Sequence, residues 1–132
     1  MRICGVELKG SEAIFVIIEN GLFTPCNTKK ITFNDSSLQS SSRFFYESIN
    51  AFARDHHIDI FAIKQRLDSG QFSAGGITFK MEALIQLCPD AETEIIHSKT
   101  IAKEQKKNDW QRPGGLNKYQ ENSYFTAMCA AL

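Results

Sequence analysis

The chain has 132 residues, of which 42% are hydrophobic and 23% are charged, values typical of a globular protein. Its length suits one domain, so we expect residues 1–132 to form a single folded unit. Fifteen Lys and Arg residues balance fifteen Asp and Glu residues, which gives a formal net charge of zero. This balance argues against a broad, charge-driven nucleic-acid surface but leaves room for one local basic face.

The apolar residues are interrupted too often for a membrane span. The longest purely apolar run is the six residues Ala13 to Ile18, far shorter than a bilayer requires. The four cysteines have no CxxC or zinc-ligand spacing; they are Cys4, Cys26, Cys88 and Cys129. We therefore expect no membrane partner, free thiols that are buried, and a location in the reducing cytoplasm.

The first third of the chain has the pattern of three strands joined by short links. Residues 2–9 alternate in polarity, and residues 13–19 are rich in β-branched and aromatic side chains. Asn20-Gly21 is a hairpin-type dipeptide, and a third strand is expected at about 29–33. These signals predict an antiparallel meander.

Helices and strands alternate over the rest of the chain. The polar stretch 34–42 offers Asp35 and serines as N-caps of a helix whose apolar stripe begins at Leu38. The other expected elements are strands at 58–66 and 93–97 and helices at 77–88, from 98 to about 103, and at 117–131. The order βββαβαβα predicts an α/β fold with a mixed five-stranded sheet and helices on both faces.

Four short motifs follow one another along these elements: CGVE at 4–7, AIKQ at 62–65, SKTIAK at 98–103 and YFTAMCAA at 124–131. In this order they resemble segments of bacterial Holliday-junction resolvases and related ribonuclease H-like nucleases. The whole chain is also similar to a family of small, uncharacterised bacterial proteins. The resemblance implies a ribonuclease H-like domain.

The resemblance also implies where catalytic acids would stand. Such nucleases use carboxylates to hold two divalent metal ions, Mg²⁺ or Mn²⁺, which activate water and stabilise the leaving oxygen. The four acidic positions fall on Glu7, Lys64, Ser123 and Thr126. Only Glu7 keeps a carboxylate, so it is the one candidate metal ligand. Glu121, the only carboxylate of the last helix, shares a stripe with apolar residues and could face the sheet.

Residues 58–66, IDIFAIKQR, end a predicted core strand in two cations and an amide. In a ribonuclease H-like sheet the first and fourth strands are parallel neighbours, so Glu7 and Lys64 should lie side by side. The two-residue period groups Lys64 with Arg66, and Glu7 with Lys9. Our hypothesis is that the Lys64 ammonium pairs with Glu7 where the nucleases hold metal; the alternative is an ordinary solvated strand end.

Other residues are weaker candidates for the same site. Glu82, in a predicted helix, could join the cluster or remain exposed. The one local excess of positive charge comprises Lys99, Lys103, Lys106, Lys107, Arg112 and Lys118. With Trp110 it could form a nucleic-acid face, or it could be a solvated helix and loop. The phenylalanines are expected in the core rather than on a stacking platform, and the Gly-Ser segment 69–76 is expected to be a plain connection.

Three functions remain open. The first is a non-catalytic or degenerate ribonuclease H-like protein that binds nucleic acid or a protein partner, including a second copy of itself. Its binding surface would be the sheet end near Glu7 and Lys64. The second is a metal-dependent, structure-selective nuclease with acids supplied by Glu82, Glu121 or another subunit. The third is an assembly protein with no nucleic-acid role.

Overall fold

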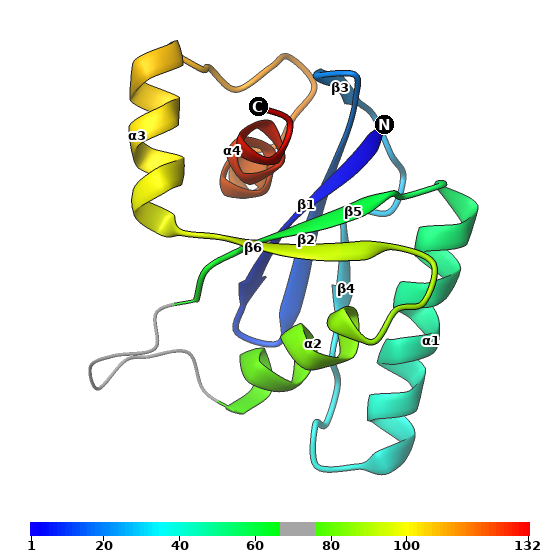
Figure 1. Ribbon diagram of the computed structural model, residues 1–132. Helices are drawn as coiled ribbons and strands as arrows, with labels where there is room; N and C mark the ends of the chain where they lie inside the picture. The colour runs from blue at the N-terminus through cyan, green and yellow to red at the C-terminus, as the bar shows by residue number, and fades with distance from the viewer. Residues whose placement is uncertain (67–75) are drawn as a thin grey trace.

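The computed structural model describes residues 1–66 and 76–132 (Figure 1). The elements are β1 (Arg2–Lys9), β2 (Glu12–Glu19), β3 (Leu22–Thr24), β4 (Lys30–Thr32), α1 (Gln39–Asp55), β5 (Ile60–Lys64), α2 (Gly76–Gln86), β6 (Glu92–Ile96), α3 (Ser98–Asn108), a 3₁₀ turn (Lys118–Gln120) and α4 (Glu121–Ala130). The expected alternation of strands and helices is confirmed. Most of the predicted 69–76 connection lies outside the described residues.

The strands form one mixed sheet in the order β3-β2-β1-β5-β6, with β4 also paired to β2. β1 is antiparallel to β2 and parallel to β5, and β5 is parallel to β6. The described sheet therefore has six strands, where the sequence predicted five. Asn20 and Gly21 both take positive φ angles, so the chain reverses at once and forms β3 before the predicted third strand, which is β4.

Helices cover both faces of the sheet, as predicted (Figure 1). On one face, α1 and α2 bury Phe45, Ile49 and Met81 against the sheet. On the other face, α3 and α4 bury Ile101 and Phe125 against it. The sheet thus separates two apolar cores, each formed by the buried faces of two helices. No helix in the described part of the chain is long and apolar enough to cross a membrane.

The start of α1 differs from the prediction. Its N-cap residue is Leu38, whose side chain gives no capping hydrogen bond and is exposed instead of joining the buried stripe. Asp35 accepts a hydrogen bond from the Ser37 hydroxyl, so these polar residues form a turn before the helix. The stripe therefore begins at Phe45.

The cysteines are all free thiols, but only two match the expected burial. Cys4 and Cys88 are buried, whereas Cys26 and Cys129 are half-buried. Burial, with a smaller contribution from the charge of Glu104, raises the pKa of Cys129 to about 11. Cys129 is therefore a protonated thiol at neutral pH.

The helix α4 lies directly against the middle of β1. A Cβ atom at Gly5 would collide with the backbone carbonyl of Ser123 and would come within 2.9 Å of Ala127. Glycine therefore allows the helix backbone to approach the strand. This close contact sets which α4 residues reach the end of β1.

Candidate functional site

The carboxyl ends of β1, β5 and β6 lie at the same edge of the sheet because these three strands are mutually parallel. Val6 is paired with Ile63 in the register, so Glu7 and Lys64 are the next residues along the two strands. The predicted adjacency of these two positions is therefore confirmed. We call this edge, with the start of α3 beside it, the polar edge; it comprises Glu7, Lys9, Lys64, Lys99 and Lys103.

The Glu7 carboxylate is bound by an amide from α4. Its Oε2 accepts a hydrogen bond of 2.9 Å from Nδ2 of Asn122. Within the described residues no ion pair joins Glu7 to Lys64, so the proposed pairing of the ammonium with this carboxylate does not occur. Both side chains are half-buried. The pairing of Glu7 with Asn122 had no sequence signal, because an isolated asparagine in a helix is an ordinary surface residue.

The two α4 positions that correspond to nuclease acids carry buried hydroxyls. The Ser123 hydroxyl donates a 2.8 Å hydrogen bond to the carbonyl of Ile14 in β2. The Thr126 hydroxyl donates one of 2.7 Å to the carbonyl of Asn122 within the helix. Both residues are fully buried and fully engaged in packing. Glu121 is half-buried and makes no hydrogen bond or ion pair with the described residues, so the structure does not connect it to Glu7.

Arg66 lies apart from Lys64, contrary to the predicted grouping. Its guanidinium forms two hydrogen bonds with the Glu82 carboxylate of α2, with Nε and Nη2 at 3.1 and 3.2 Å from the oxygens. The guanidinium carbon is 3.4 Å from the centre of the Phe79 ring. The two-residue alternation fails here because β5 ends at Lys64, and Arg66 then turns toward α2.

Gln65 connects β5 to α3 in the same region. Its backbone amide donates to the carbonyl of Ile96, which ends β6. Its side-chain oxygen accepts from the backbone amide of Ser98, and the Ser98 hydroxyl donates to the Gln65 carbonyl. These bonds hold the first turn of α3 at the polar edge.

The exposed cations of the polar edge come from two elements. Lys9 is the last residue of β1, and Lys99 and Lys103 lie one turn apart on α3. All three are exposed. The sequence suggested that Trp110 could join these cations in a nucleic-acid face. It is instead half-buried and packs against the core beneath α3 and α4. The indole ring of Trp110 is therefore not displayed beside the exposed lysines.

The donor set does not fit the two divalent metals that the resemblance implies. Nowhere in residues 1–66 or 76–132 do three His, Cys, Asp or Glu side chains gather closely enough to hold a metal ion. Glu82 is engaged by Arg66, and Glu7 is engaged by Asn122. The polar edge therefore presents ammonium groups and one amide-bound carboxylate rather than a carboxylate cage.

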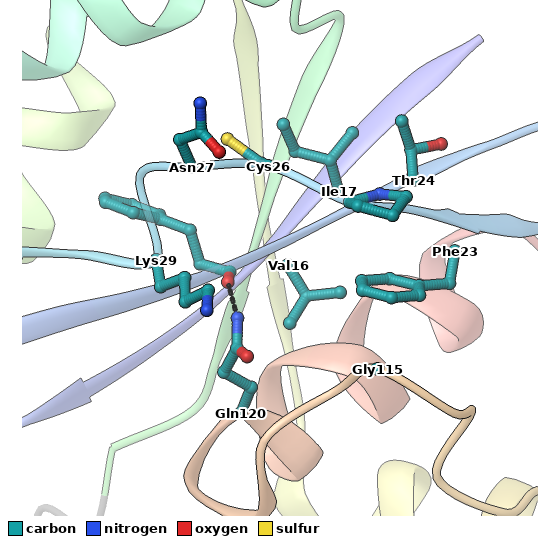
Figure 2. Close-up of a pocket in the computed structure, with 11 residues that line it drawn as sticks. Val16, Ile17, Phe23, Thr24, Cys26, Asn27, Lys29, Gly115 and Gln120 are labelled. Carbon is teal, nitrogen blue, oxygen red and sulfur yellow. Dashed lines mark hydrogen bonds between the residues drawn. The ribbon is translucent and has the colours of Figure 1, made fainter.

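A pocket of about 230 Å³ lies elsewhere, along the outer edge of β2 (Figure 2). Along this edge β2 pairs with β4 at residues 12–14 and with β3 at residues 17–19, and the pocket lies between these two pairings. There the buried Gln120 side chain donates a hydrogen bond to the carbonyl of Phe15. The wall includes Cys26 and Lys29. None of the predicted site residues lines this pocket, so it is separate from the polar edge.

The side chain of His56 packs next to this pocket, beside Cys26 of its wall. The ring of His56 lies 4.7 Å from that of Phe52, and its Nε2 is 3.6 Å from Sγ of Cys26. Its neighbours are an aromatic ring and a thiol at the end of α1.

Two solved structures of RuvC from Thermus thermophilus are similar to nearly the whole chain. One, in complex with a Holliday junction substrate, has a TM-score of 0.77 at 4% identity and covers 99% of this chain and 92% of its own. The other has a TM-score of 0.70 at 6% identity, covering 99% and 93%. The fold is therefore ribonuclease H-like and of the RuvC type, as the resemblance implied.

The chain belongs to the protein family of unknown function DUF3010, whose model matches residues 1–130. No curated protein matches the sequence. The family and the fold are thus established together, and the function must be argued from the polar edge.

Proposed function

We propose that the protein binds nucleic acid at the polar edge without hydrolysing it. The observation that carries the proposal is the replacement of the expected acids. Glu7 is held by Asn122, an ammonium stands at Lys64, and Ser123 and Thr126 are buried hydroxyls. A site of this composition lacks the ligands for metal-assisted phosphodiester hydrolysis but retains cations that can contact phosphate.

Two further observations support nucleic acid as the ligand. Lys9, Lys99 and Lys103 are exposed, and an exposed lysine can approach a phosphate without breaking an existing contact. A RuvC structure of the same fold is in complex with a Holliday junction substrate. Since the chain carries no net charge, binding should depend on this local group of cations rather than on the whole surface.

The binding proposal predicts a specific salt dependence. Fluorescence anisotropy with labelled four-way junction, duplex, single strand and structured RNA would measure the affinity without metal. In the double variant Lys99→Gln/Lys103→Gln, the slope of log K against log salt should become shallower by about 2, because each phosphate contact contributes about 0.9. Arg43→Gln is the matched control, because Arg43 is an exposed cation on α1, across the sheet from α3.

The nuclease alternative is decided in the same samples. Cleavage of any of these substrates that requires Mn²⁺ and disappears in Glu7→Gln would overturn the non-catalytic proposal. Absence of binding to every substrate would contradict a nucleic-acid role and favour a protein partner or an assembly function. If the double variant binds with an unchanged salt slope, Lys99 and Lys103 of α3 do not contact phosphate.

A further inference from the structure

An exposed aromatic ring lies at the same end of the sheet as the polar edge. Phe79, in the first turns of α2, is 50% exposed although it is a large apolar residue. The Arg66 guanidinium lies 3.4 Å from its ring centre, a cation–π contact. The sequence placed the phenylalanines in the core, and Phe79 contradicts that expectation. An exposed apolar ring has an unfavourable hydration free energy, which contact with a ligand would offset.

The ring is held by a fixed arginine. The side chains of Arg66 and Glu82 are only 10% and 17% exposed, and their two hydrogen bonds fix the plane of the guanidinium. Phe79 and Glu82 are three residues apart on α2 and so share one face of the helix. Arg66, whose charge is paired with Glu82, thereby orients Phe79.

The location of the ring relative to the cations is also defined. Arg66 follows Lys64 by two residues, and the start of α2 lies at the same end of the sheet as the start of α3 (Figure 1). Among the phenylalanines that the structure describes, Phe44 is the other strongly exposed one; it lies on α1 and has no cation–π partner within the described residues. Phe79 is thus an oriented aromatic ring at the same end of the sheet as the exposed ammonium groups (Figure 1), a combination that suits single-stranded nucleic acid.

We propose that Phe79 is a stacking platform for an unpaired base, which makes the polar edge selective for single-stranded or locally unpaired nucleic acid over continuous duplex. The inference rests on the proposed nucleic-acid function and specifies its ligand. A base inside a duplex already stacks on both sides, so only an unpaired base can present a free face to the ring. The exposed lysines at this end of the sheet would contact phosphates of the same strand.

The test compares Phe79→Leu with Phe44→Leu. Leucine keeps apolar volume and removes the aromatic face, and Phe44 on α1, which is 65% exposed, is the matched control. Phe79→Leu should weaken binding to a single-stranded oligonucleotide by about 5- to 100-fold and leave duplex binding unchanged. The salt slope should stay the same, because no phosphate contact is lost. Phe44→Leu should change neither affinity.

A second measurement reports stacking directly. A single strand that contains 2-aminopurine should change its fluorescence on binding the wild type and should show a smaller change with Phe79→Leu at saturation. Thermal unfolding of each variant would confirm that it is folded. If Phe79→Leu weakens single-strand and duplex binding equally, or changes neither, the proposal that a base stacks on Phe79 is wrong. The proposal of nucleic-acid binding at the polar edge would still stand. If the wild type binds no nucleic acid, both proposals fail.

Discussion

At the scale of single residues, the polar edge is defined by what Glu7 contacts. The neighbouring strand supplies an ammonium at Lys64, yet the carboxylate bonds to the neutral amide of Asn122. An amide donor leaves the carboxylate charge in place, so Glu7 keeps the capacity to attract a cation. Lys64, which carries a positive charge next to it, opposes metal binding by electrostatic repulsion.

This arrangement predicts that Lys64→Glu creates a metal site. Two neighbouring carboxylates would repel each other without metal and would bind Mn²⁺ together. Saturating Mn²⁺, at about a hundredfold above its dissociation constant, should then stabilise Lys64→Glu by about 2–3 kcal/mol in thermal unfolding. Lys64→Gln, which removes the charge alone, should gain much less. Equal Mn²⁺ stabilisation of the wild type would show that Lys64 does not prevent metal binding.

At the scale of elements, the contact between β1 and α4 positions the edge. Gly5 lets α4 lie on the strand, which places Asn122 at Glu7 and buries Ser123 against β2. A side chain at position 5 would push the helix away and separate these pairs. The stability of the fold and the geometry of the site therefore depend on the same contact.

We predict that Gly5→Ala destabilises the protein by about 3 kcal/mol, at the upper end of the range for overpacked cores, because the clash involves the backbone of α4. Urea unfolding followed by circular dichroism would measure the loss. Gly114→Ala is the control, since a Cβ there meets no described atom within 4 Å. Similar stability of the two variants would show that α4 does not pack on β1 as described.

At the scale of the whole molecule, one sheet connects two apolar cores. The core under α1 contains Phe45, and the core under α3 and α4 contains the half-buried Trp110. The strands contribute alternate residues to each core, so neither core can be lost without the sheet. This arrangement supports the proposal that the chain is one cooperative domain.

The cooperative domain predicts that the two cores unfold together. Phe45→Ala should cost about 3–5 kcal/mol. It should lower the urea midpoint seen by Trp110 fluorescence, which reports the opposite core, by the same amount as the midpoint seen by circular dichroism. A fluorescence midpoint that stays at the wild-type value would indicate two independently unfolding halves.

The sequence by itself determined the type and order of most elements. Local signals predict an element from its own residues, because side chains follow the period of a strand or a helix. Examples are the alternation in residues 2–9, the dipeptide Asn20-Gly21 and the helix stripe through Ile49. The adjacency of Glu7 and Lys64 was instead implied by the resemblance to ribonuclease H-like sheets, in which the first and fourth strands are parallel neighbours. The extra strand β3 was missed because three residues carry too little periodicity.

Only the tertiary structure decided the partners of the site residues. Glu7 and Asn122 are 115 residues apart, and the period of a helix does not tell which strand it covers. Arg66 left its predicted face because the strand ends at Lys64, and Phe79 is exposed because α2 turns that side outward beside Arg66. Periodicity describes one element at a time, whereas these contacts depend on how separate elements pack together.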